Sequence, residues 1–287
     1  MDIHDDPALL ENWYYSIELA PELFSTGAQY RNIALTRTIL SRVDVRGRRC
    51  LDLGTQEALV PALLSRRGAG AITATDILDK TPQIDLVRRA LGFSFRYVPN
   101  QTIDGLPHSL LSEAPYDVVI CSGLLYHVSD PYRWIALAGS MCAPEGILIF
   151  ETAAVDDAAP ILLYNARGAF FTGPTTYYFP SLRFIEEALR VIGAVPIDAC
   201  RLKTNRKSGK DIFRVALAAR MKRDDDDPYL QRVRMTHDTR PFKNSFPPTV
   251  PVGYAIERCG DLETMVLETP PLIVTPDQVR LRISDQI

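Results

Sequence analysis

Two residues of the chain, Gly54 and Asp76, stand where apolar strands are expected to end. Gly54 follows the apolar run of residues 50–53, and Asp76 lies near the end of a second run, residues 71–77. Ligands of open α/β sheets meet the carboxyl ends of parallel strands, and a residue without a Cβ lets them approach the backbone. A carboxylate about 20 residues further on can accept from both ribose hydroxyls. This spacing predicts a cleft that binds a nucleoside.

Each of these residues also has a purely structural interpretation. Gly54 could form only a tight turn between strand and helix, and Asp76 could cap a helix. Ala58 stands where a dinucleotide-binding loop would have its third glycine. Together the two motifs favour a nucleoside ligand without deciding which one.

Residues 116–131 hold the side chains best suited to acid–base chemistry. The strand expected at residues 117–121 is followed by Ser122 and then by Tyr126 and His127. Imidazole titrates near neutral pH, so His127 is a candidate general base. The Tyr126 ring could pack against a ligand while its hydroxyl orients a substrate. Alternatively, His127 shapes the loop through a hydrogen bond and Tyr126 only closes the pocket.

Two charged residues are further candidates for binding a substrate. Glu151 is expected to end the strand of residues 147–151, where it could anchor a polar or cationic group or bond only to the next loop. Arg206 belongs to the compact basic cluster that also contains Lys207 and Lys210, which could equally be the solvated tip of a hairpin.

Aromatic side chains gather in two other segments. Residues 170–179 connect the fifth expected strand to the next helix, and loops often carry specificity, so we predict Tyr177 and Tyr178 on the wall of the substrate site. Tyr14 lies in the aromatic cluster of residues 13–17, which could cover the mouth of the cleft or simply pack within a helix.

The elements that must position these residues alternate in type. Strands are predicted at residues 50–53, 71–77, 95–98, 117–121 and 147–151, and helices at residues 59–67, 84–91, 132–141 and 182–192. Such alternation indicates βαβ units around a parallel sheet, which is an α/β fold. Residues 197–202 and 212–219 should form an antiparallel pair at the end of the sheet. Residues 6–19 and 27–43 carry helix-like apolar spacing.

The chain is therefore expected to have three parts. Residues 1–45 would be an N-terminal helical cap, residues 46–222 the core, and residues 223–287 a proline-rich extension containing short strands such as residues 264–267 and 279–283. Apolar pieces of the extension, including residues 272–274, are too hydrophobic for a solvated linker. We expect the extension to fold over the core or to pair with another subunit, as in a homodimer.

Composition narrows the partners and the compartment. The net charge of −3 provides no overall attraction to phosphate backbones, which disfavours nucleic acid. The five cysteines contain no C-x-x-C pair for a metal site and are expected to be buried thiols in a reducing compartment. The N-terminus is acidic and no apolar run approaches membrane-spanning length, so we expect a cytoplasmic protein without a membrane partner.

The order of these motifs resembles a known family. Gly54, Asp76, Tyr126 with His127, and residues 144–149 follow one another as in class I methyltransferases, which use S-adenosylmethionine (SAM) and have a Rossmann-like sheet. More narrowly, the chain resembles the branch of tRNA wobble-uridine 5-oxyacetate carboxymethyltransferases. The motifs that carry this narrower resemblance are residues 122–127, Asp130-Pro131, Glu151-Thr152 and residues 178–181.

The resemblance, which covers residues 13–219, implies roles for individual residues. The cofactor-binding residues would be Asp52, Gly54, Thr55, Gln56, Asp76, Ile77, Ile103, Asp104 and Ser122. Within this set Gly54 and its neighbours would face the methionine part of SAM, Asp76 the ribose, and Ile103 with Asp104 the adenine. Ile103 could equally be core packing and Asp104 an exposed turn. The substrate-binding residues would be Tyr14, Tyr30, Glu151, Tyr177, Tyr178 and Arg206, with Tyr126 and His127 at the reaction itself.

Three functions stay open at this point. Tyr30 and Leu35 stand where the carboxymethyl branch usually has tryptophan and lysine, which favours ordinary SAM and a small aromatic or polar acceptor for the methyl group. A tRNA-modifying methyl- or carboxymethyltransferase is the alternative. A catalytically silent SAM-binding scaffold is the third, suggested by Ala58 and the long extension. An NAD-dependent oxidoreductase is disfavoured because the chain lacks G-x-G-x-x-G.

Overall fold

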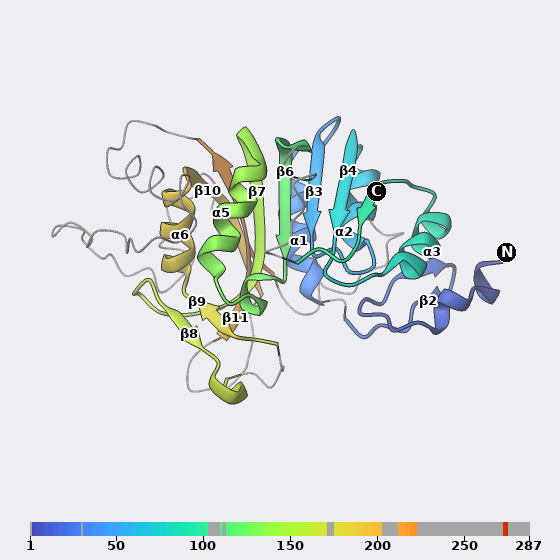
Figure 1. The fold of residues 1–287 in the computed structure, drawn as a ribbon, viewed down its shortest axis with the longest axis horizontal. Coiled ribbons are helices and arrows are strands. Elements are labelled where there is room, and N and C mark those ends of the chain that lie inside the picture. Colours follow the sequence, from blue (N-terminus) through green and yellow to red (C-terminus); the bar gives the residue numbers. More distant parts are fainter. Residues whose placement is uncertain are drawn as a thin grey trace.

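The computed structural model describes residues 2–29, 31–102, 110, 113–170, 175–202, 212–222 and 272–274 of the 287-residue chain. These residues form a central sheet of eight strands in the order β12-β10-β11-β7-β6-β3-β4-β5 (Figure 1). The parallel part consists of β3 (Arg49–Leu53), β4 (Ala71–Thr75), β5 (Arg96–Val98), β6 (Tyr116–Ser122) and β7 (Cys142–Val155). The strand order reverses at β3, between β4 and β6, and ligands of such sheets bind at this kind of reversal.

One end of the sheet is antiparallel. β11 (Ile212–Met221) inserts between β7 and β10 (Ala194–Leu202) and runs antiparallel to both. This confirms the antiparallel pair expected at the end of the sheet. β12 (Leu272–Val274), one of the apolar pieces of the C-terminal extension, adds to β10 as a parallel strand. The strands expected at residues 264–267 and 279–283 lie outside the described residues.

Helices cover both faces of the sheet, which gives the α/β arrangement expected from the alternation and the Rossmann-like form implied by the resemblance. α1 (Arg31–Arg42), α2 (Leu59–Arg66) and α3 (Thr81–Leu91) pack into one buried core, and α5 (Pro131–Met141) and α6 (Leu182–Val191) into the other. Alternate residues of β6 enter opposite cores: Val118 and Ile120 join the first, Val119 and Cys121 the second. This two-sided burial explains why the strand reads as a continuous apolar run.

Helix ends follow local sequence signals. The Asp130 carboxylate accepts from Arg133 N at 2.9 Å and Pro131 occupies the first turn of α5. Ser181 caps α6 in the same way, accepting from Phe184 N at 3.1 Å. Because caps and proline at the first turn are local rules, these helix starts were predicted to within one residue.

The helix expected at residues 6–19 is wrong. The chain there forms two short 3-10 turns, η1 (Ile3–Asp5) and η2 (Pro7–Leu10), and then an extended segment that leads to the hairpin of β1 (Glu18–Ala20) and β2 (Leu23–Phe24). Its buried side chains alternate with more exposed ones, and the buried set is Trp13, Tyr15, Ile17 and Leu19. A period of two is the strand pattern, and aromatic and β-branched residues favour it over helix. The N-terminal cap is therefore helical only in α1.

β7 is longer than expected, and this changes the position of Glu151. The predicted strand ended at residue 151, whereas β7 continues to Val155 because β11 pairs with it throughout residues 147–155. Beyond β7, the short strands β8 (Leu162–Tyr164) and β9 (Tyr178–Pro180) pair with each other. This β8–β9 arm and the β1–β2 hairpin lie at the edge of the sheet to which the parallel strands run, on either side of it (Figure 1).

Two composition-based expectations can be compared with the described residues. The cysteines at positions 50, 121, 142 and 200 are all buried and form no disulfide with one another, while Cys259 lies outside the described residues. Among the described helices none has the length and hydropathy that would let it cross a membrane.

Candidate active site

The loop after β3 turns sharply at the carboxyl edge of the sheet. Gly54 has a φ of +77°, and a Cβ on it would lie 2.7 Å from the side chain of Leu124. The backbone N–H groups of Gly54 and Thr55 both donate to the Thr75 carbonyl, at 2.8 and 3.0 Å, which ties this loop to the end of β4. A larger residue at position 54 would be strained and would clash.

Two further residues of this loop adopt the left-handed conformation without being glycine. Gln56 has a φ of +49° and Ala58 a φ of +63°. Each such residue costs roughly 1–3 kcal/mol and persists only where the surroundings enforce it. Ala58 therefore has the left-handed backbone conformation that glycine favours, although it carries a Cβ.

Asp76 lies directly after β4 and joins this edge of the sheet. Its carboxylate accepts from Gln56 N at 2.7 Å and from Leu78 N at 2.9 Å. Burial raises the pKa of Asp76, and the two backbone donors oppose that shift. Ile77 beside it is 61% exposed. Asp76 does not cap a helix. Its carboxylate instead joins the loop after β3 to the loop after β4.

Asp52 has a more unusual environment. It is 1% exposed, and neither carboxylate oxygen has a hydrogen-bond partner among the described residues. Burial raises the pKa of Asp52 to about 7, the negative charge of Asp76 adds to this shift, and the nearby Thr55 hydroxyl opposes it. The buried Thr55 hydroxyl therefore lies near this carboxylate, but the two side chains are outside normal hydrogen-bond distance and angle, and Thr55 Oγ1 has no other partner among the described residues. A buried carboxylate without partners is costly, so such a group points to a ligand.

Ser122 is the predicted cofactor-binding residue at the end of β6. Its hydroxyl lies 2.7 Å from the hydroxyl of Thr36, which is fully buried on α1. Ser122 ends β6, one strand away from β3, so the structure brings it to the same edge of the sheet as Asp52 and Gly54.

Tyr126 and His127 lie on the short helix η3 (Leu125–His127) just after this edge. The His127 Nδ1 atom lies 2.7 Å from the carbonyl oxygen of Thr175. Because a carbonyl only accepts, Nδ1 carries the proton and Nε2 has the lone pair. Burial lowers the pKa of His127, the Arg214 charge adds to the effect, and the Thr175 hydrogen bond opposes it. The imidazole is thus held neutral, in the tautomer that can accept a proton.

Glu151 does not end its strand and does not offer a free carboxylate. It is fully buried within β7, and both of its oxygens accept from the guanidinium of Arg214 on β11, with 2.7 Å between Nε and Oε1. The Arg214 guanidinium also lies over the Tyr126 ring, 4.9 Å from its centroid. Gly123 faces this group, since a Cβ on it would lie 3.3 Å from the Tyr126 hydroxyl. The Glu151–Arg214 pair therefore helps to hold the Tyr126 ring in place.

Arg214 is a site residue that the sequence analysis missed. The signal was present, because a single arginine interrupts the otherwise apolar strand of residues 212–219. The sequence analysis also missed Glu57 and Lys80, which lie in the loops after β3 and β4 and form an ion pair with 2.9 Å between Oε1 and Nζ. Both side chains are buried.

The described tyrosines among the predicted substrate-binding residues are Tyr14, Tyr177 and Tyr178. Tyr14 lies edge-on to Tyr15, with 4.9 Å between ring centroids, and its backbone N–H donates to the carboxylate of Glu57, in the loop after β3, at 2.9 Å. Tyr177 is 42% exposed and its backbone N–H donates to the Tyr126 carbonyl at 2.8 Å. Tyr178 packs against Tyr164 within the β8–β9 arm, with 5.4 Å between ring centroids. Tyr30, Ile103, Asp104 and Arg206 lie outside the described residues.

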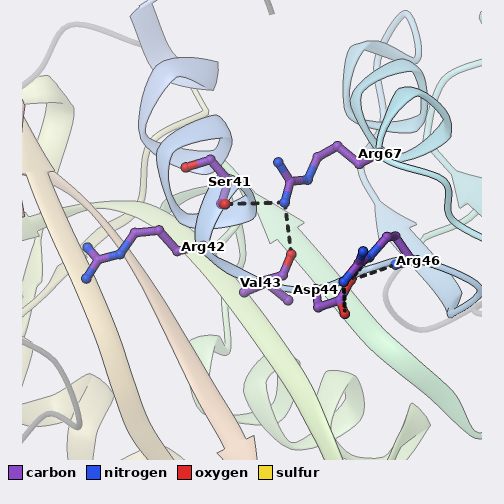
Figure 2. Close-up of a pocket in the computed structure, with 6 residues that line it drawn as sticks. All are labelled: Ser41, Arg42, Val43, Asp44, Arg46 and Arg67. Carbon is purple, nitrogen blue, oxygen red and sulfur yellow. Dashed lines mark hydrogen bonds and ion pairs between the residues drawn. The ribbon is translucent and has the colours of Figure 1, made fainter. Parts of the chain in front are cut away.

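A hollow of about 400 Å³ lies at the opposite edge of the sheet. It lies at the amino ends of the strands and is lined by residues 41–44 and Arg46 before β3 and by Arg67 before β4 (Figure 2). Its cations are already engaged: Arg46 pairs with Asp44, Arg42 with Asp198, and Arg67 donates to the carbonyls of Ser41 and Val43. We therefore place the functional site at the carboxyl edge, where the unpartnered Asp52 lies.

One known family model matches the central part of the chain. Residues 25–197, more than half of the chain, match the family model described as "Methyltransferase domain". The matched range contains β3, β4, β6 and β7, and therefore Asp52, Gly54, Asp76 and His127.

Two relatives and one solved structure illustrate the similarity. A ubiquinone biosynthesis O-methyltransferase of Xylella fastidiosa is 30% identical over 115 residues, which are 40% of this chain and 45% of that protein. A tRNA U34 carboxymethyltransferase of Desulfotalea psychrophila is 28% identical over 94 residues, 33% of this chain and 29% of that protein. The chain thus matches less than half the length of these relatives. The N-terminal domain of EvdMO1, solved with S-adenosylhomocysteine (SAH) bound, has a TM-score of 0.58, covers 77% of this chain and 98% of its own, and is 16% identical, so it indicates the fold.

Proposed function

Because the chain belongs to the methyltransferase-domain family, we propose that it transfers a methyl group from SAM to an oxygen, nitrogen or sulfur atom of a small aromatic or polar acceptor. The observation that carries this proposal is the buried carboxylate of Asp52 beside Gly54 and Asp76, which has no hydrogen-bond partner within the part of the chain that the structure describes. Acceptors of this size suit a site with the Tyr126 ring, which lies against the Arg214 guanidinium, and the net charge of −3 favours them over nucleic acid.

The residues present fit SAM. Its methionine part carries a cationic ammonium and a sulfonium, and a cation offers the partner that the Asp52 oxygens lack. Gly54 leaves the backbone open to close approach. Each oxygen of Asp76 already accepts one backbone bond and can accept a second, which suits two ribose hydroxyls. Thr55, Gln56, Ile77 and Ser122 complete the proposed cofactor site, with Ile103 and Asp104 as its further predicted members.

When bound, SAM supplies an electrophilic methyl group for an in-line displacement, whose rate depends mainly on alignment. Tyr126, held by the Arg214 guanidinium, would orient the acceptor. The free Nε2 of His127 would take the proton of an acceptor hydroxyl, thiol or ammonium. Glu151 would neutralise and hold Arg214, since both of its oxygens already accept from that guanidinium and its side chain is fully buried.

A second candidate is a tRNA-modifying methyl- or carboxymethyltransferase. The match to the tRNA U34 carboxymethyltransferase favours it, as does the presence of a buried cation, Arg214, beside Tyr126. The bidentate contact with Glu151 argues against it, since the Arg214 charge is already balanced. Clearly tighter binding of carboxy-SAM than of SAM would support this second function, and so would tRNA binding that weakens steeply with salt.

The proposal is tested by calorimetry with SAH and by a methyl-transfer assay. The assay would use SAM with a labelled methyl group and a panel of phenols, catechols, aromatic amines and thiols. Binding of SAH in the micromolar range and transfer to at least one class of acceptor are expected. Binding without transfer to any acceptor, tRNA included, would favour the third function, a SAM-binding scaffold, and absence of binding would contradict all three.

A further inference from the structure

We propose that Glu57 and Lys80 are positioning residues that hold an N-terminal strap, residues 12–29, closed over the cofactor cleft, so that strap closure and cofactor binding stabilise each other. This inference rests on the proposed function because it takes the cofactor to bind at Asp52, Gly54 and Asp76. It assigns roles to a buried ion pair that the methyl-transfer chemistry itself does not use.

The strap is a defined structure of its own. It folds back through β1 and β2, and its two ends pair where Ser16 N donates to the Gln29 carbonyl and Gln29 N to the Tyr14 carbonyl, both at 3.0 Å. The Ser25 hydroxyl donates to the Tyr15 carbonyl at 2.7 Å. Gly27 packs directly on this backbone, since a Cβ there would lie 2.1 Å from the Tyr15 carbonyl oxygen. Because these contacts lie within the strap, we expect residues 12–29 to open or to stay closed together.

Glu57 joins the strap to the loop after β3. Its carboxylate accepts from Tyr14 N at 2.9 Å and from Tyr15 N at 3.1 Å, and it is fully buried. These two N–H groups are consecutive backbone donors, so one side chain fixes the strap at a single point. A carboxylate with two backbone donors and an ammonium as partners is well satisfied, which is how such a charge can stay buried.

Lys80 joins the same point to the loop after β4. Its ammonium donates to Glu57 at 2.9 Å and to the Asn12 carbonyl at 2.7 Å, and its backbone N–H donates to the Tyr97 hydroxyl at 3.1 Å. Glu57 lies three residues after Gly54, and Lys80 lies four residues after Asp76. The two proposed cofactor loops and the strap thus meet in one buried ion pair.

The strap also packs on the core beside the cofactor loops. Its buried side chains Trp13, Tyr15, Ile17 and Leu19 belong to the same hydrophobic cluster as Ile33 of α1 and Leu59, which follows the loop after β3. A strap that opened would expose these side chains and release Glu57 from its two backbone donors, so a cofactor that holds the loop after β3 in place gains from a closed strap.

The backbone of the loop after β3 supports the same coupling. The residues on either side of Glu57, Gln56 and Ala58, both have positive φ values of +49° and +63°. Gln56 is held by its N–H bond to Asp76, and Glu57 by the strap. Because strained backbone persists only where its surroundings enforce it, loss of the Glu57 contacts should loosen the loop that meets the cofactor.

The test compares three variants of the full chain. Glu57→Gln keeps the shape but removes the charge, and Lys80→Met removes the other partner. The matched control is Arg89→Met, which breaks the ion pair between Arg89 on α3 and Asp6. That pair also ties the N-terminal segment to the core, but it lies before the strap and touches neither cofactor loop. Thermal unfolding of each variant checks that it folds.

Two quantities are measured on each protein: the dissociation constant for SAH and the rate of cleavage by chymotrypsin. Chymotrypsin suits the strap because residues 12–29 contain several aromatic residues and no lysine or arginine. If the strap is closed in roughly one molecule in ten of a variant, SAH binds about tenfold more weakly. We expect this loss for Glu57→Gln and Lys80→Met, faster cleavage in the strap, and less protection by SAH. The control should bind SAH within about twofold of the wild type.

The outcomes separate this inference from the proposed function. If the wild type does not bind SAH, the proposed function fails. If the wild type binds and both folded variants keep its affinity and its protection of the strap, the strap inference is wrong while the function stands. Should Glu57→Gln fail to fold, Lys80→Met alone decides between these results.

Discussion

The His127 Nδ1 atom lies 2.7 Å from the Thr175 carbonyl oxygen, and the loop that carries this carbonyl is held by Asn165. The buried Asn165 amide donates to the neighbouring Thr176 carbonyl at 3.0 Å and accepts from Phe170 N at 3.0 Å. The acceptor for His127 is therefore fixed from a different segment, which sets the tautomer that leaves Nε2 free.

This tautomer predicts how the reaction rate depends on pH. The pKa of His127 is lowered from its ordinary value, so the active neutral form persists below pH 6.5, and kcat at saturating SAM, where Asp52 is already paired with the cofactor, should fall only in more acidic solution. His127→Asn keeps a donor toward Thr175 but lacks the base, and we expect about a 100- to 10,000-fold loss of kcat together with loss of the acidic limb. A variant that retained the limb would show that another group is the base.

The same shift has a consequence for stability. The unfolded chain protonates His127 more readily than the folded protein, so the free energy of unfolding should decrease as pH falls through about 6.5. Urea unfolding of the wild type and of His127→Asn at pH 7.5 and 5.5 measures this term, which the variant should lack.

Asp52 predicts a pH dependence of opposite sign. Its pKa is raised to about 7, so the folded protein binds this proton more tightly than the unfolded chain, and the free energy of unfolding should decrease as pH rises toward 7. Asp52→Asn should stabilise the ligand-free protein at pH 8, by on the order of 2–4 kcal/mol, and should weaken SAH binding at least tenfold. Urea unfolding and calorimetry are the measurements. Stabilisation without loss of SAH affinity would place the cofactor's cation elsewhere.

The buried pair of Glu151 and Arg214 should be costly to break on one side. Arg214→Met leaves an unpaired carboxylate in the core, and we expect a loss of about 3–5 kcal/mol in the free energy of unfolding. Adding Glu151→Gln to that variant should recover a large part of the loss, because no charge is then left buried. The double variant should still show reduced turnover, because the Tyr126 ring loses its contact with the Arg214 guanidinium. Full turnover of the double variant would mean that Tyr126 needs no support.

The C-terminal extension should matter for the assembled enzyme. β12 pairs with β10 in parallel register, from Cys200 with Leu272 to Leu202 with Val274, and covers the edge of the sheet. Truncation after Asp227 should expose that edge and cause aggregation or a change of oligomeric state, with lower turnover. Ile273→Pro is a milder test, because proline cannot donate to the ladder. Light scattering and the transfer assay check both, and a truncated chain that stays soluble, keeps its assembly and is fully active would contradict this prediction.

Local pattern in the sequence determined most of the sheet and the position of Gly54 and Asp76. Strand and helix periods, caps and prolines depend on residues close to one another in the chain, and these rules located β3, β6, α5 and α6 to within a few residues. The helical period expected for residues 13–19 is wrong, because every second side chain there is buried, as in a strand. The parallel order of the sheet then placed Asp52, Gly54 and Asp76 at one edge.

Only the tertiary structure decided the partners of the buried charges. Glu151 meets Arg214 because β11 inserts next to β7, and Glu57 meets Lys80 and the strap because two loops and the N-terminal segment converge at one edge. These pairs join residues tens of positions apart, and no local period encodes which of many acids and bases will meet. The absence of a partner for Asp52 among the described residues is of the same kind, since the chain must be folded before an acid can be seen to lack one.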